Sequence, residues 1–144
     1  MRRILVTSLI IGMILSFATS IGGCKKAIRK AQENFVLEVM TNGTWVVTKM
    51  AEGSAVTTSA FDGYEFQFKR DRSVDAIKNG VVMGTGNWDP RESEQSIYSN
   101  FSSGSEAVLQ KLNGVWQLYS VSFTTVKTRQ TKSGLEWNLD LAKK

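Results

Sequence analysis

Hydrophobic and polar residues follow two different periods along this chain. Between residues 25 and 40, apolar side chains recur every three or four positions, at Ile28, Ala31, Phe35 and Val39. This is the spacing of one face of an α-helix. From Asn42 onward the pattern changes to short β-branched and aromatic runs separated by turn residues. The sequence therefore predicts one short helix, whose C-terminal half packs on the domain, followed by an all-β region.

The strand period is clearest in YEFQFKR, residues 64–70, where Tyr64, Phe66 and Phe68 alternate with polar side chains. The final strand, GLEWNLDL, alternates in the same way, and Asn79-Gly80 between two apolar runs is a strong hairpin signal. One wet and one buried face per strand predicts an antiparallel sheet. About eight or nine strands in roughly 100 residues predict a meander closed as a barrel or a flattened sandwich.

Two further segments give weaker signals. Residues 56–63, VTTSAFDG, are predicted to form a weak strand that ends in a turn. Residues 105–114, SEAVLQKLNG, are predicted to form a short helix or turn, with Ser105 as its N-cap and Gly114 beyond its end.

The N-terminus has the pattern of a secretory signal. A short basic start, MRR, precedes an uncharged apolar run from Ile4 to Phe17, and small residues then lead to Cys24, the only cysteine. The motif Ile21-Gly22-Gly23-Cys24 resembles the lipobox of bacterial lipoproteins, which implies cleavage before Cys24 and a diacylglycerol on its thiol. Two alternatives are a membrane-spanning helix over the uncharged residues 4–23 and an ordinary signal peptide that leaves a free thiol.

The predicted organisation has three parts: a lipoprotein signal peptide at 1–23, a lipid-anchored helical tether at 24–41, and a β domain at 42–144. Residues 24–144 carry 16 basic and 13 acidic side chains. The charges are scattered without a basic stripe, so we expect no nucleic-acid partner. Lys25, and not the Asp that retains bacterial lipoproteins at the inner membrane, follows the cysteine. We therefore expect a lipid-anchored protein of the outer membrane that faces the periplasm.

Catalytic chemistry has little support in the sequence. The chain has no histidine, which excludes Ser-His-Asp and Cys-His arrangements and most zinc sites. Carboxylates at Asp71, Asp75 and Asp89 leave a two-carboxylate or a calcium site as hypotheses, but arginines interleave with them. We expect no enzyme activity, no metal site, and no cofactor apart from the covalent lipid.

The β region resembles a known family. Gly43-Thr44-Trp45 looks like the G-x-W motif of lipocalins, and residues 42–141 are similar to the small lipocalin-like domains of Gram-negative lipoproteins. This resemblance implies a tryptophan at the floor of a barrel and a cavity for a small apolar ligand. The only late-strand arginine, Arg129, is the candidate for the arginine that packs over this tryptophan in lipocalins. The implied cavity would be lined by aromatic side chains: Trp45, Phe66, Phe68, Trp116 and Trp137.

Two functional classes follow from this sequence. In the first, the protein is a lipid-anchored module that binds a small apolar ligand without catalysis. In the second, the same aromatic side chains fill the barrel, which is just wide enough for that. The protein would then be a structural or interaction subunit with an envelope protein partner.

Overall fold

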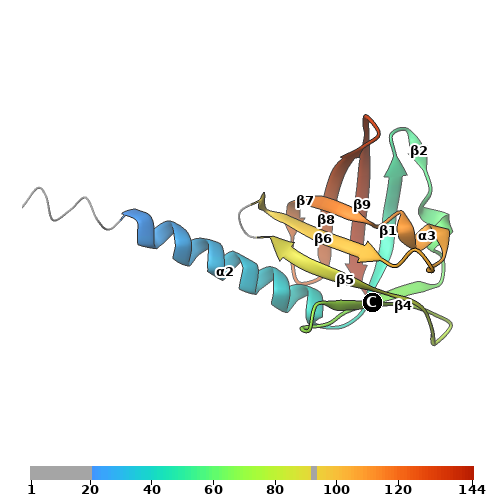
Figure 1. Cartoon of the computed structure of the whole chain (residues 1–144), viewed down its shortest axis with the longest axis horizontal. Coiled ribbons are helices and arrows are strands. Elements are labelled where there is room, and N and C mark those ends of the chain that lie inside the picture. The colour runs from blue at the N-terminus through green and yellow to red at the C-terminus, as the bar shows by residue number, and fades with distance from the viewer. Residues whose placement is uncertain (1–20, 92–93) are drawn as a thin grey trace, which may run out of the picture.

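An antiparallel β-barrel with a projecting N-terminal helix makes up the computed structural model, which describes residues 21–91 and 94–144 (Figure 1). The predicted signal peptide therefore lies almost entirely outside the described residues. Helix α2 spans Ile21–Thr41, and nine strands follow it in the sequence. The strands are β1 (Trp45–Glu52), β2 (Ala55–Val56), β3 (Tyr64–Phe68), β4 (Ser73–Lys78), β5 (Val81–Arg91), β6 (Ser96–Phe101), β7 (Gly114–Val121), β8 (Thr125–Lys132) and β9 (Leu135–Lys143).

The strands form an up-and-down meander that closes on itself. Strands β3 to β9 each pair with the next in the sequence, and β1 pairs with both β3 and β9. The closing β1–β9 ladder runs from Trp45 opposite Lys143 to Glu52 opposite Trp137. Eight strands thus complete the ring, while the two-residue β2 lies outside it on the end of β1. The prediction of an all-β antiparallel meander closed as a barrel, with a short N-terminal helix, is confirmed.

Local sequence signals account for most of the turns. Asn79 and Gly80 both have positive φ, at 53° and 76°, and join β4 to β5 as the Asn-Gly signal predicts. In β3, Tyr64 and Phe66 are buried, whereas Gln67 is exposed, so the predicted alternation is confirmed. In β9, Leu139 and Leu141 are buried but Leu135 is half exposed, because the strand begins in the exposed β8–β9 turn.

One of the two weaker predictions is wrong, and the other is right for the helix but wrong for its N-cap. Residues 56–63 do not form a strand: after β2, residues Thr58–Phe61 form a 3₁₀ helix, η1, whose Phe61 is buried in the core. The Thr58 hydroxyl bonds to the backbone of Met50, and such side-chain bonds to the backbone compete with a ladder. The short helix α3 spans Ala107–Gln110, but its cap position is Glu106, and Ser105 bonds to Ser102 instead.

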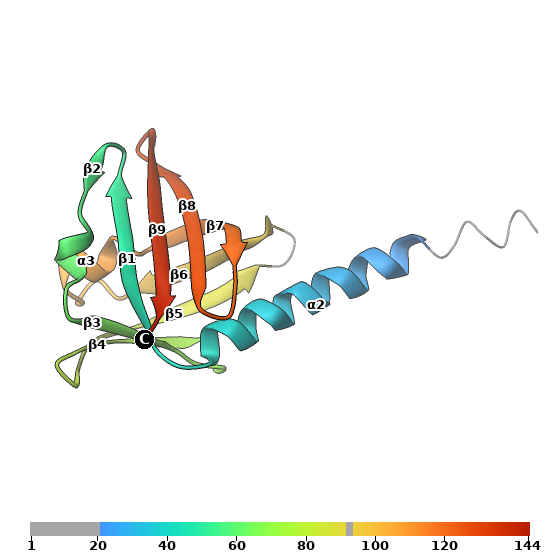
Figure 2. The same cartoon turned by 180° about the vertical axis from the view of Figure 1, so that it is seen from behind.

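The barrel core is complete within residues 36–141. The buried cluster in the described residues begins at Val36 and ends at Leu141. Val36, Val39 and Met40 of α2 belong to this cluster, and α2 packs against β3 and β5. Because the core and the closing ladder, which reaches Lys143, both lie within residues 36–143, we expect residues 24–144 to fold without the preceding segment. Figure 2 shows that the other end of α2 projects away from the barrel.

Candidate functional site

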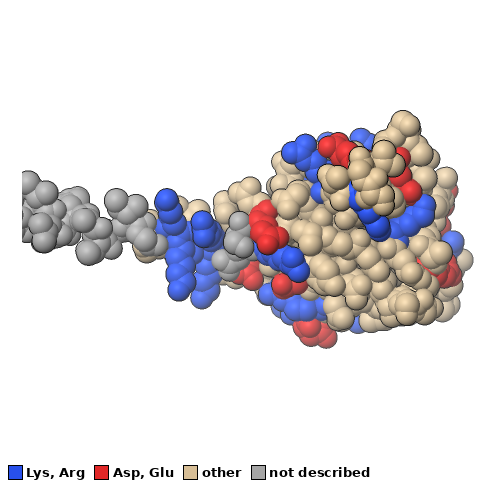
Figure 3. Space-filling view, turned by 45° about the horizontal axis from the view of Figure 1, so that its top comes forward, with Lys and Arg blue, Asp and Glu red and all other residues tan. Residues whose placement is uncertain are grey.

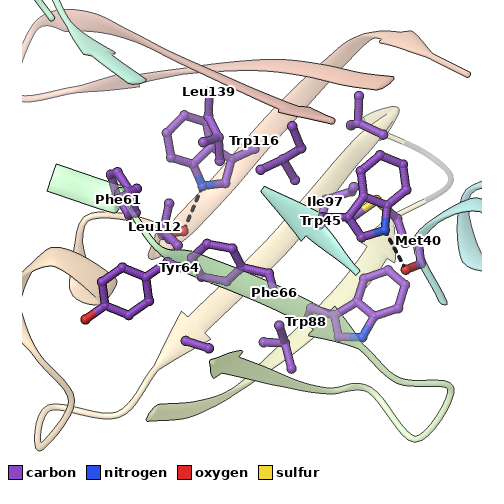
Figure 4. Close-up of a cluster of buried hydrophobic side chains, with 14 of the residues drawn as sticks. Met40, Trp45, Phe61, Tyr64, Phe66, Trp88, Ile97, Leu112, Trp116 and Leu139 are labelled. Carbon is purple, nitrogen blue, oxygen red and sulfur yellow. Dashed lines mark hydrogen bonds between the residues drawn. The ribbon is translucent and has the colours of Figure 1, made fainter. Parts of the chain in front are cut away.

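Three tryptophans are buried in the barrel core. Each of them stands two positions after a glycine in the sequence. Trp45, Trp88 and Trp116 are at most 2% exposed. Each indole N–H donates to a backbone carbonyl: Trp45 to Met40 at 3.0 Å, Trp88 to Lys69 at 3.0 Å, and Trp116 to Leu112 at 2.8 Å. Two of these bonds and the surrounding side chains are drawn in Figure 4. Buried indoles need such an acceptor, so these side chains are fixed parts of the core.

A lysine covers the first tryptophan. The Lys143 ammonium lies 5.4 Å from the centroid of the Trp45 ring, within the range of a cation–π contact. Lys143 ends β9 and pairs with Trp45 across the closing ladder. The lipocalin resemblance leads one to expect an arginine here, and the candidate Arg129 lies instead on the exposed side of β8. The closing ladder thus supplies a cation over this tryptophan from another strand.

The five predicted ligand-binding side chains do not form one pocket. Trp45, Phe66 and Trp116 are buried, and Phe68 and Trp137 are half-buried. Phe66, Phe68 and Trp116 line a void of about 40 Å³ in the barrel interior, but Trp45 and Trp137 do not reach it. Phe68 packs edge-on against Trp88, with ring centroids 5.3 Å apart. Small-molecule sites span about 300–1,000 Å³, so the interior void is roughly tenfold too small for such a ligand.

A larger cavity lies beside helix α2, at one end of the barrel. It is an open groove of about 520 Å³ between helix α2 and the ends of β5 and β7. Its apolar lining comes from two sources, α2 with Ile28, Ala31, Phe35 and Val36, and the barrel wall with Pro90, Leu118, Tyr119 and Val121. We call this cavity the α2 groove. Phe35 also meets Phe123 edge-on at 5.4 Å, and Phe123 is 61% exposed, so the apolar surface continues past the groove.

Helix α2 forms the groove because its buried face differs from the predicted stripe. The buried residues are Val36, Val39 and Met40, whereas Ile28 and Phe35 of the predicted stripe stay 58% and 39% exposed. An ion pair between Glu33 and Arg72, 3.6 Å apart, fixes the helix to the barrel beside this buried face. The periodicity of the sequence identified the apolar residues of this helix. It did not show that most of them lie next to the face that packs on the barrel, and not on that face.

The predicted lipidation residue lies on the same helix. Cys24 is exposed and unpaired, and it stands in the first turns of α2. Helix positions advance by about 100° per residue, so Cys24, Ile28, Ala31 and Phe35 fall within an arc of about 60°. We call these four residues the α2 stripe. No helix within residues 21–91 and 94–144 combines the length and the hydrophobicity needed to cross a bilayer.

The acidic residues considered for catalysis are held by neighbouring cations and hydroxyls. Asp75 accepts hydrogen bonds from Lys69 at 2.6 Å and from Thr85 at 2.9 Å. The bond from Lys69 lowers the pKa of Asp75 and raises that of Lys69. Asp71 accepts from Ser73, and Asp89 lies 3.6 Å from Arg72. In the described part of the chain, no three metal-ligating side chains gather in one place.

One tyrosine has a strongly shifted pKa without a site around it. Burial, together with a hydrogen bond to Glu106, raises the pKa of Tyr64 to about 12. A phenol with so high a pKa stays protonated, and here its hydroxyl ties β3 to the residue before α3. Its ring is part of the core cluster, so this shift is a consequence of packing.

Comparison with known proteins supports the fold only. No protein-family model matches the sequence, and no curated protein matches it. Among solved structures, a DUF4847 family protein from Bacteroides vulgatus ATCC 8482 is similar, with a TM-score of 0.55 and 16% sequence identity. The alignment covers 74% of this chain and 96% of that protein. At this identity the likeness shows a shared small barrel.

Proposed function

We propose that this chain is a non-catalytic, lipid-anchored protein of the bacterial cell envelope that binds an apolar ligand in the α2 groove. Cys24 carries the lipid, and the anchor holds the protein on the periplasmic side of the outer membrane. The lipobox resemblance and the exposed position of Cys24 at the far end of α2 support the anchor. The histidine-free composition and the paired acids support the absence of catalysis.

The observation that carries this proposal is the contrast between two cavities. The interior void measures about 40 Å³, whereas the α2 groove measures about 520 Å³ and has an apolar lining. The groove is within the size range of small-molecule sites. The lipocalin resemblance suggests an apolar ligand, and the groove, not the interior, has the room for one.

A groove-filling variant tests this proposal. Purified residues 24–144 should bind an environment-sensitive fatty-acid-like probe saturably, with about one site. Ala31→Trp places an indole in the groove and should weaken binding at least about tenfold, whereas Ala27→Trp, on the same helix but outside the groove lining, should leave it unchanged. Equal binding by wild type and Ala31→Trp would show that the probe binds elsewhere on the protein and would contradict the groove.

The filled interior also favours the second functional class. If a panel of apolar probes shows no saturable binding while the barrel stays folded, the protein is better described as an interaction subunit of an envelope complex. The same groove would then be the first surface to examine for a protein partner, because it is the larger of the two apolar cavities described here.

A further inference from the structure

The nine residues of the projecting helix from Cys24 to Gln32 carry an unusual charge. Residues 24–32 hold four cations and no acid: Lys25, Lys26, Arg29 and Lys30. We call these four residues the basic arc. Residues 33–144 hold 12 basic and 13 acidic side chains, a net charge of −1. The excess positive charge of residues 24–144 is therefore concentrated on one short stretch of helix, where Figure 3 shows the Lys and Arg side chains gathered beside the barrel.

The basic arc and the α2 stripe lie on different sides of the same helix. At about 100° per residue, the four cations cover a sector centred roughly opposite the stripe. All four cations are exposed, and so are Cys24, Ile28, Ala31 and Phe35. A helix with cations on one face and apolar side chains on the other is typical of peptides that lie in a membrane interface.

The amphipathic part of α2 is exposed, and a side chain of the barrel lies next to its apolar face. The first residue of α2 in the buried core is Val36, so the residues before it lie outside the core cluster. Phe123, from the loop after β7, meets Phe35 of the stripe and is itself 61% exposed. Apolar side chains from two elements therefore lie side by side along the α2 groove.

We propose that the α2 stripe and the α2 groove dock on the surface of an anionic phospholipid membrane. The stripe and Phe123 contact the acyl boundary, and the basic arc attracts the anionic headgroups. This inference names the apolar ligand of the proposed function as membrane phospholipid and rests on the α2 groove being the binding site. It does not require acylation of Cys24. Charge complementarity between a +4 segment and an anionic surface selects this occupant over a neutral apolar molecule.

Vesicle binding by unacylated protein tests the inference. Residues 24–144 with Cys24→Ser, which cannot be acylated at this position, should cosediment with vesicles of phosphatidylglycerol and phosphatidylcholine. They should bind vesicles of phosphatidylcholine alone much more weakly, and added salt should weaken the binding. Each interfacial lysine contributes about fivefold, so Lys26→Gln with Lys30→Gln should lower the partition coefficient about 25-fold. The matched pair Lys49→Gln with Lys127→Gln, both exposed on the barrel, should lower it less than about twofold.

A dye reports which face of the helix touches the membrane. In the Cys24→Ser background the chain has no other cysteine, so a polarity-sensitive dye can be placed at Ile28→Cys in the stripe or at Lys26→Cys opposite it. At saturating vesicle concentration, only the dye at position 28 should shift to the blue. Equal shifts at both positions, equal binding to neutral vesicles, or an equal loss in the control pair would overturn the proposal. A dimer that Ile28→Gln dissociates, with vesicle binding unchanged, would show instead that the stripe joins two copies of this chain.

If the fatty-acid-like probe does not bind the protein but the protein binds the vesicles as described, the α2 groove binds only membrane phospholipid. If the probe binds and the vesicles do not, the proposed function stands and the phospholipid inference falls.

Discussion

At the scale of single residues, the barrel interior satisfies most of its polar groups but not all of them. The indole N–H groups of Trp45, Trp88 and Trp116 all reach a backbone carbonyl. Gln130 and Trp137 face each other across β8 and β9, and in the described part of the chain neither the Gln130 amide nitrogen nor the Trp137 indole nitrogen has a partner. Gln130 is 8% exposed, so its amide is held away from solvent without compensation.

Replacing this glutamine should therefore stabilise the protein. A buried donor without a partner costs about 1–3 kcal/mol, and leucine has a similar size without that cost. Gln130→Leu should raise the free energy of unfolding by about 1 kcal/mol, measured by urea denaturation of residues 24–144. A loss of stability would mean that a bound water or ligand satisfies the amide in solution.

The sequence showed which residues are buried better than it showed how they pack. Alternation identified Tyr64 and Phe66 as interior side chains, and both are buried. It did not show that Phe68 would pack against Trp88 or that Trp137 would lie outside the void. Residue type and period determine which face a side chain takes, but the volume left inside a closed barrel depends on how all the rings fit together.

At the scale of elements, strands β3, β4 and β5 are joined by one charged cluster. Gln67 of β3 pairs with Asp75 of β4, and Asp75 pairs with Thr85 of β5. The Asp75 carboxylate accepts from Thr85 and from Lys69, which follows β3. Its side chain is 14% exposed, so the hydrogen bonds are partly shielded from water.

This cluster should give the protein a dependence on acid pH. Because the folded-state pKa of Asp75 is lowered, its contribution is fully present above the unfolded pKa of about 3.9. It is lost as pH falls through that value toward the lower folded pKa. The stability difference between wild type and Asp75→Asn should therefore shrink between about pH 5 and pH 3. Urea unfolding across this range measures it.

Asp62→Asn is the matched control, because Asp62 is exposed and its side chain makes no hydrogen bond or ion pair within the described residues. If the difference in free energy of unfolding between wild type and Asp75→Asn does not change with pH, the Lys69–Asp75 bond is not formed in solution.

Elements with strong periodic signals were predicted well, and those with mixed signals were not. The predicted helix at 25–40 lies within α2, and the predicted hairpin at Asn79-Gly80 joins β4 to β5. The strand predicted at 56–63 is wrong because the Thr58 hydroxyl bonds to the backbone of Met50, which favours a turn of 3₁₀ helix over an outer strand. The α3 cap failed because Ser105 pairs with Ser102. Both errors concern short polar side chains with several local partners.

At the scale of the whole molecule, closure of the barrel was predictable and the candidate site was not. Each of the eight strands of the meander has one apolar face. Closing the meander into a barrel is one of the few arrangements that bury all of these faces. The α2 groove, by contrast, joins α2 to residues of β5 and β7 that lie 50 to 90 positions away in the sequence. Nothing in the periodicity of either segment marks that contact.

The predicted anchor is tested on the complete chain in cells. If Cys24 is acylated, wild type should fractionate with membranes and incorporate labelled palmitate. Cys24→Ser should take up no label and should either remain unprocessed or be released from the membrane by salt, since stable attachment needs at least two acyl chains or one chain with a basic patch. Detergent partitioning and radiolabelling measure the two results separately.

Recovery of Cys24→Ser in the membrane at mature size, as tightly held as wild type, would contradict lipidation. The vesicle experiment on unacylated protein remains informative in that case.

The continuity of α2 also sets how the barrel meets its surroundings. One unbroken helix runs from Cys24 to the first core residue, Val36, a rise of about 18 Å. If Cys24 is held at a bilayer, the α2 groove stays close to the lipids. Its encounters with a ligand are then confined to the membrane surface. Tethering of this kind raises the local concentration to the millimolar range. A groove with a dissociation constant too weak to detect in dilute solution would then be occupied for much of the time on the membrane.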